Sequence, residues 1–274
     1  MEINSSKPSD GLWLYLILTY TLSWLTWAIA IAVGISMTST PGLLIYFIGG
    51  CFPSIVGVIL LYRYTPRPER DFWRRLTGFG LISSGWWALI LLWMPAIMLL
   101  ALGLNYLLGL PPPGFDLIRQ IAANPVILAA LLLQFIIAGP LSEELGWRGF
   151  ALDRLLKRWG LLKGSLILGL LWWAWHLPLY FFIGSTYYRW GLFSAEFWLF
   201  LLRTIPLTIL ISLAYVANRR SLLSAVAIHF TFNLILNLIA PVTTLIYLFQ
   251  AIFMIVLVSG VWLVSKSVNS QKPN

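Results

Sequence analysis

Uncharged apolar runs of about 20 residues recur along the whole chain and alternate with short polar segments. Each run has the length that a helix needs to cross roughly 30 Å of hydrocarbon. We expect spans at about 12–35, 42–62, 85–109, 125–150, 162–183, 197–217, 222–240 and 242–264. The pattern therefore predicts an all-α, polytopic bundle of about eight transmembrane helices, in which residues 1–274 form a single transmembrane domain.

The composition indicates a lipid environment and excludes a soluble globular domain. Of 274 residues, 60% are hydrophobic and 10% are charged, and the mean hydropathy is +0.87. A soluble core of this size could not absorb so many long apolar runs. The first run, 12–35, is too long for the core of a signal peptide, so we expect it to be a retained helix. Cys51 is the single cysteine, which excludes an internal disulfide and a cysteine-rich metal site.

Positive charges gather in the segments between the apolar runs. The segment after the second run reads TPRPERDFWRRLTGF, where we expect a short interfacial helix that Phe72 and Trp73 anchor in the membrane surface. The formal net charge of +9 follows from these segments and does not indicate a basic groove. We therefore expect membrane lipids as partners and no nucleic acid.

The distribution of Lys and Arg between alternate loops predicts the orientation in the membrane. The basic loops carry Arg63, Arg67, Arg70, Arg74, Arg75, Arg154, Lys157, Arg158, Lys163, Arg219, Arg220, Lys266 and Lys272. The opposite loops carry only Arg119 and Arg189. By the positive-inside rule, the protein is expected to be a multi-pass protein of the cell membrane with its N- and C-termini in the cytoplasm.

Charged residues inside the apolar runs are rare, and three of them lie together in GPLSEELGWR. A charged side chain at the centre of the bilayer costs about 2.5–3.5 kcal/mol, so Glu143, Glu144 and Arg148 are expected to face protein or water. Glu144 and Arg148 are four residues apart and can pair on one helix face, whereas Glu143 points about 100° away and can act as a base. The alternative is an acid-base cluster that is merely solvated at the cytoplasmic end of a span.

Both histidines of the chain also lie inside apolar runs. His229 and Asn233 are four residues apart, so their side chains can point at one atom and form an oxyanion hole. Trp172 lies one turn before His176 and could pack over its imidazole, or it could simply fill a helix interface. Each histidine could instead be a packed residue that bonds a carbonyl. In the functional interpretation, a water-filled cavity that opens to the cytoplasm connects Glu143 with both histidines.

The segments EELGWRGFALDRL, WAWHLP and HFTFN resemble the three motifs of the CAAX-protease and bacteriocin-processing family of intramembrane proteases, which includes the type II prenyl-protein endopeptidases. The resemblance covers the second half of the chain, with the motifs within 139–237. Trp172 departs mildly from the phenylalanine that the family usually has four residues before the histidine. The resemblance implies that Glu143 and His176 activate a water molecule and that His229 and Asn233 stabilise the oxyanion. Glu144 and Arg148 would then orient the site.

Family members are also described as metalloproteases. Glu143, His176 and His229 could supply three ligands of a catalytic zinc or another divalent metal, with water in the fourth place. The chain has no HExxH motif to support this set. Metal and direct base catalysis therefore both stay open.

We expect an intramembrane endopeptidase that hydrolyses a peptide bond of a membrane-associated protein or peptide, with a prenylated substrate as one option. One alternative is a proton-coupled transporter, in which buried Glu and His relay protons, although no repeat relates the two halves of the chain. The other alternative is a membrane scaffold or immunity factor that retains the motifs and acts by binding a partner.

Overall fold

The computed structural model describes residues 11–65, 68–239 and 243–270, which contain helices and no β-strand. The α-helices are α1 Leu12–Ala32, α2 Thr40–Tyr64, α3 Pro68–Thr77, α4 Ser84–Leu107, α5 Asp116–Ala123, α6 Val126–Ile136, α7 Ser142–Gly146, α8 Asp153–Trp175, α9 Thr186–Trp190, α10 Ala195–Ala217, α11 Leu222–Leu238 and α12 Thr244–Ser270. Two π-helical turns, η2 Ile137–Leu141 and η3 Trp147–Leu152, flank α7, and two 3₁₀ turns are η1 Phe79–Leu81 and η4 Leu177–Phe181. The predicted polytopic helical bundle is confirmed.

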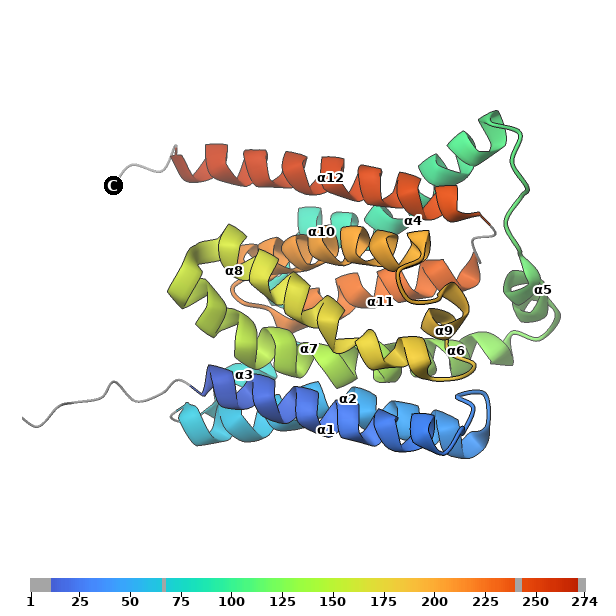
Figure 1. Ribbon diagram of the computed structural model, residues 1–274. Helices are drawn as coiled ribbons and strands as arrows, with labels where there is room; N and C mark the ends of the chain where they lie inside the picture. Colours follow the sequence, from blue (N-terminus) through green and yellow to red (C-terminus); the bar gives the residue numbers. More distant parts are fainter. Residues whose placement is uncertain (1–10, 66–67, 240–242, 271–274) are drawn as a thin grey trace, which may run out of the picture.

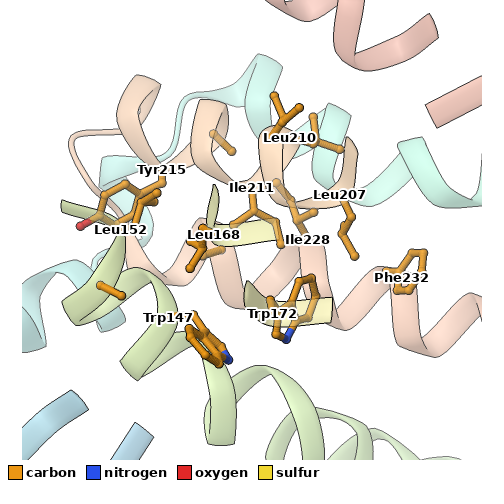
Figure 2. Packing of buried hydrophobic residues seen from close by; sticks show 14 of the residues in the cluster. Trp147, Leu152, Leu168, Trp172, Leu207, Leu210, Ile211, Tyr215, Ile228 and Phe232 are labelled. Atoms are coloured by element: carbon orange, nitrogen blue, oxygen red, sulfur yellow. The ribbon is translucent and has the colours of Figure 1, made fainter. Parts of the chain in front are cut away.

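The helices pack in layers around α10, which is the most enclosed of the long apolar helices. Helix α10 packs against α8, α11 and α12, while α1 and α2 pack against each other along the opposite side of the bundle. Figure 1 shows α12 and α4 above, α1 and α2 below, and the α7, α8, α10 and α11 segments between them. The core between α10 and α11 is apolar, and Figure 2 shows Leu207, Ile211 and Ile228 packed there with Trp172 nearby.

Six helices of the described chain are long and apolar enough to cross a membrane. The fourth of them is a continuous helical run, Val126–Phe181, that contains the two predicted spans 125–150 and 162–183. Gly160 bends this run with φ +70°, a value that residues with a side chain rarely adopt. The predicted span 222–240 corresponds to α11, a shorter apolar helix. The count of eight spans is therefore not confirmed.

A short helix, α3, lies where the interfacial helix was expected, but it is anchored differently. The side chain of Trp73 is 50% exposed, whereas Phe72 is 1% exposed and packs inside the bundle. A Cβ added to Gly149 would lie 3.3 Å from Cε2 of Phe72, which puts this ring against η3. The expectation that both aromatic residues anchor in the membrane surface was therefore wrong for Phe72.

Candidate active site

Glu143 and Glu144 lie on α7, a short helix within a distorted stretch of backbone. Pro140 lacks the N–H that a regular helix needs, and Ala138 has non-helical angles of φ −85° and ψ 33°. The helix therefore widens into the π-turn η2 just before the two glutamates. Both carboxylates end up inside the protein, with Glu143 8% exposed and Glu144 fully buried.

Glycines let α2 approach α7 very closely. A Cβ on Gly146 would lie 1.9 Å from the backbone oxygen of Pro53, and a Cβ on Gly57 would lie 2.5 Å from Cα of Gly146. The Ser54 hydroxyl donates a hydrogen bond to the carbonyl oxygen of Leu141, at 2.8 Å. Because the two backbones are in contact, α2 fixes the position of the glutamate-bearing turn.

Glu144 lies between a guanidinium and an imidazole. Its Oε1 accepts hydrogen bonds from Nη1 of Arg148 and from Nδ1 of His229, each at 2.8 Å. The Glu144 and Arg148 side chains are both fully buried, and the expected pairing between them is confirmed. Because an ionised carboxylate only accepts hydrogen bonds, Nδ1 of His229 carries a proton and its Nε2 is left for another partner.

Glu143 is held differently from its neighbour. Its Oε2 accepts a hydrogen bond from the indole Nε1 of Trp172 at 2.6 Å, and it makes no ion pair with any residue in the described part of the chain. Trp172 also contacts both imidazoles edge to face, with ring centroids 5.9 Å from His176 and 5.1 Å from His229. The Arg148 guanidinium lies 4.7 Å from the Trp172 ring centroid. Trp172 therefore contacts Glu143, Arg148 and both histidines.

His176 caps the C-terminal end of α8 and is followed at once by η4, whose second residue is Pro178. Its Nδ1 lies 2.8 Å from the carbonyl oxygen of Trp172, so Nδ1 is the donor and the lone pair of neutral histidine lies on Nε2. The indole of Trp24 in α1 donates to the carbonyl oxygen of Trp175 at 3.0 Å, which ties this end of α8 to α1. Nε2 of His176 is thus an acceptor whose position is fixed by the backbone at the end of α8.

His229 and Asn233 of α11 both face Gly139 in the π-turn η2. A Cβ added to Gly139 would lie 2.8 Å from Nδ2 of Asn233 and 3.8 Å from Nε2 of His229. The two nitrogens therefore approach the same side of the turn that leads to Glu143. The sequence pattern placed His229 and Asn233 on one helix face but gave no indication that Gly139 allows this approach.

Two cavities meet at these residues. A small cavity of about 20 Å³ is lined by Glu143, His176 and Ser142, with Trp27, Tyr46 and Trp175 among its other walls. A second cavity, of about 560 Å³, is also lined by Glu143 and His176 and includes Trp172, His229 and Asn233. The second cavity thus brings together five of the predicted site residues, whereas Glu144 and Arg148 lie behind them.

The larger cavity extends in an unexpected direction. Beyond the site, it is lined by Met37 before α2, Arg189 of α9 and Tyr247 of α12. The basic segments lie at the end of the bundle that holds α3 and the Gly160 bend. The elements that line the far part of the cavity lie at the opposite end (Figure 1). The cavity thus extends away from the basic segments, and its expected opening to the cytoplasm stays a prediction.

The fit of a metal ion can be judged from the same side chains. Within residues 11–65, 68–239 and 243–270, no group of three or more His, Cys, Asp or Glu side chains could hold a metal ion. Nδ1 of His229 bonds Glu144, and Oε2 of Glu143 bonds Trp172. The proposed set of Glu143, His176 and His229 does not form a three-ligand site as these side chains stand, and zinc binding stays a prediction.

Comparison with known proteins points to one family. The family described as "Type II CAAX prenyl endopeptidase Rce1-like" matches residues 125–235, a range that includes all seven predicted site residues. A CAAX prenyl protease 2 from Methanococcus maripaludis is 31% identical over 232 residues, which cover 83% of this chain and 84% of the relative. The similarity therefore extends well beyond the motifs.

Proposed function

This chain belongs to the Rce1-like family of type II CAAX prenyl endopeptidases, and we propose that it hydrolyses a peptide bond inside the membrane with water activated by Glu143 and His176. Membership of this family makes the chain a protease with a helical membrane domain. The roles of the individual side chains are the proposal.

The small cavity between Glu143 and His176 is the observation that carries this proposal. Its volume of about 20 Å³ suits a single water molecule, which needs roughly 10–15 Å³ of such space. Oε2 of Glu143 is occupied by the Trp172 indole, so Oε1 is left to accept a hydrogen bond from the water. The Nε2 lone pair of His176 is available on the other side. A water molecule here would meet two proton acceptors and be polarised for attack.

The chemistry can be followed bond by bond. The water oxygen attacks the scissile carbonyl carbon while one water proton passes to Glu143 or His176. The carbonyl oxygen becomes an oxyanion beside Asn233 Nδ2 and His229 Nε2. The carbon–nitrogen bond then breaks, and the stored proton moves to the departing amine. The products are a new carboxylic acid and a free amine, which ionise to a carboxylate and an ammonium group, so atoms and charge balance.

His229 can stabilise the oxyanion only as an imidazolium. Its Nδ1–H bonds Glu144, so Nε2 can donate only when it also carries a proton. The carboxylate of Glu144 accepts from Nδ1–H and so fixes the orientation of the ring, and Arg148 holds the carboxylate in place. Asn233 supplies the second donor through its carboxamide. Hydrogen-bond donors that are already fixed in a buried site stabilise a developing oxyanion without reorganising during the reaction.

The substrate we propose is a membrane-associated protein or peptide with a prenyl group. The relative's name, CAAX prenyl protease 2, supports a prenylated substrate, and the large cavity offers space for a peptide next to Glu143. The long apolar helices suit a substrate that reaches the site from the lipid phase.

The proposal is tested by comparing the wild type with Glu143→Gln in detergent, on a panel of fluorogenic prenylated peptides. Glu196→Gln is the matched control, because Glu196 lies at the start of α10 and bonds Thr244 away from the site. We expect cleavage by the wild type and the control, and none by Glu143→Gln. Cleavage with and without chelator, together with elemental analysis for zinc, would decide the metal prediction. Equal turnover by wild type and Glu143→Gln would contradict the proposed base.

A further inference from the structure

A groove on the outer side of α10 takes no part in the mechanism above. It has a volume of about 500 Å³ and lies between α8 and α12, which both pack on α10. Figure 1 shows α12 along one side of the bundle, with α10 and α8 next to it. The walls of this outer groove include Leu162 of α8, Leu202 and Ile209 of α10, and Ile255, Ser259 and Trp262 of α12. Among the described residues that line it, only Ser259 and Trp262 carry a polar side-chain atom.

Helix α10 separates the outer groove from the catalytic cavity. Phe200, Arg203 and Leu207 line the catalytic cavity, whereas Leu202 and Ile209 line the groove. With 3.6 residues in each turn, these two sets of side chains lie on opposite faces of α10. A ligand in the outer groove therefore does not reach the groups that we propose for hydrolysis, and the groove is a separate site.

The outer groove has the dimensions of a site for one hydrocarbon chain. From Ile255 to Trp262 it follows α12 for seven residues, which is about 10 Å at 1.5 Å per residue. This is less than half of the roughly 30 Å of hydrocarbon in a bilayer, so the groove lies within one leaflet. Its end at Leu162 is two residues after the Gly160 bend, at the basic end of the bundle. The groove thus begins near one membrane surface and extends toward the middle of α12.

Positive charge lies at the end of the groove where a lipid headgroup would be. Lys157 and Lys163 flank the Gly160 bend, both are exposed, and Lys163 directly follows Leu162 in the groove wall. Neither lysine has a carboxylate within ion-pair distance in the part of the chain that the structure describes. An ammonium group binds phosphate as a point charge, so this end favours a headgroup with a net negative charge.

We propose that the outer groove binds one acyl chain of an anionic phospholipid of the surrounding membrane, with its phosphate headgroup at Lys157 and Lys163. The chain fills the space that α8 and α12 leave over α10, and the two ammonium groups select the headgroup. A zwitterionic lipid offers the same chain but no net negative charge, so it binds more weakly. The proposal concerns lipid binding and does not depend on the proposed hydrolysis.

The test uses the fluorescence of Trp262, which lines the outer groove. The protein is placed in two sets of vesicles of the same composition, an equal mixture of phosphatidylglycerol and phosphatidylcholine. Only the chains of phosphatidylglycerol are brominated in one set, and only those of phosphatidylcholine in the other. Bromine quenches a tryptophan that it contacts, and the difference between wild type and Trp262→Phe isolates the signal of Trp262. We expect the relative association constant at Trp262 to favour phosphatidylglycerol roughly 5- to 30-fold.

Two comparisons show whether the lysines and the groove cause this preference. Lys157→Gln/Lys163→Gln should remove the preference at Trp262 and leave the quenching by phosphatidylcholine in place. Trp13 is 61% exposed on α1 and does not line the groove, so the signal isolated with Trp13→Phe should show no preference between the two lipids. The same preference at Trp13 as at Trp262 would overturn the proposal, because the charge of the whole surface would then explain it.

A substitution that fills the groove tests the place of the chain. Ser259→Phe should reduce the quenching of Trp262 by both lipids, whereas Val256→Phe, at an exposed position of α12 outside the groove, should not. Equal quenching of Trp262 by the two brominated lipids in wild type would overturn the proposal. Release of the quenching by a farnesylated peptide, and not by unbrominated phosphatidylglycerol, would also overturn it, because the groove would then hold the substrate.

Discussion

Gly139→Ala should separate catalysis from folding at this site. The added Cβ would lie 2.8 Å from Nδ2 of Asn233, whereas ordinary contact begins at 3.4 Å, so the carboxamide must retreat by at least 0.6 Å. The clash is with the end of a side chain and not with backbone. Alanine also favours a helical backbone over glycine by about 0.5–1 kcal/mol. We therefore expect Gly139→Ala to fold and to melt near the wild-type temperature.

The expected loss is in turnover. Reacting groups must be held within about 0.5 Å of their productive positions, and the loss of one oxyanion donor costs about 10²–10³-fold in kcat. Because Asn233 is displaced in Gly139→Ala and not removed, we expect a decrease of roughly 10- to 100-fold in kcat with KM nearly unchanged. The assay is steady-state cleavage of a fluorogenic prenylated peptide, alongside a thermal melt.

Two controls make this prediction sharp. Gly103→Ala lies in α4 with no atom within 4 Å of the added Cβ, so it should turn over like wild type. The double variant Gly139→Ala/Asn233→Ala should be no slower than Asn233→Ala alone, since the glycine acts through the carboxamide. Full activity of Gly139→Ala, or additive losses in the double variant, would refute the oxyanion geometry.

Two further substitutions test the frame around the site. Gly146→Ala would place a Cβ 1.9 Å from the backbone oxygen of Pro53, so we expect the free energy of unfolding to fall by about 1–3 kcal/mol in a detergent unfolding assay. Gly260→Ala has open space around its Cβ and should be as stable as wild type. Equal stability of the two variants would contradict the close packing of α2 and α7. Trp172→Phe keeps an aromatic ring but removes the N–H that donates to Glu143, so we expect kcat to fall roughly tenfold. Circular dichroism should show that the variant keeps its helical fold. An unchanged kcat would show that this hydrogen bond is dispensable.

Local features of the site could be predicted from the sequence. The Glu144–Arg148 pair depends only on a spacing of four residues along a helix, and the structure contains it. The second partner of Glu144 is His229, 85 residues away, and the partner of Glu143 is Trp172. These contacts depend on how separate helices pack, which periodicity does not report. Trp172 was expected over an imidazole or in a helix interface, and its bond to Glu143 was not foreseen.

Exposure to lipid was harder to predict than helix position. In a membrane, the face toward lipid and the face toward the core are both apolar, so the pattern that located α3 could not show that Phe72 points inward while Trp73 stays exposed. Arg203 is a different case. An arginine within an apolar run can be identified from the sequence alone. Because a charge inside the membrane costs free energy, the sequence could have marked Arg203 as a candidate functional residue. Only the structure shows that no carboxylate of the described residues lies within ion-pair distance of Arg203.

The direction of the cavity and the distribution of charge together predict on which side of the membrane the site is open. The cavity extends toward Met37, whereas the basic segment with Lys157 lies at the other end of the bundle. In a Cys51→Ser background, Met37→Cys and Lys157→Cys should react with an impermeant maleimide from opposite sides. If the positive-inside rule holds here, Met37→Cys reacts from outside the cell, and the cavity extends toward that side. If Met37→Cys reacts only from the cytoplasm, the termini lie outside and the charge rule fails for this chain. Labelling of both positions from one side would show that the cavity does not extend as the structure places it.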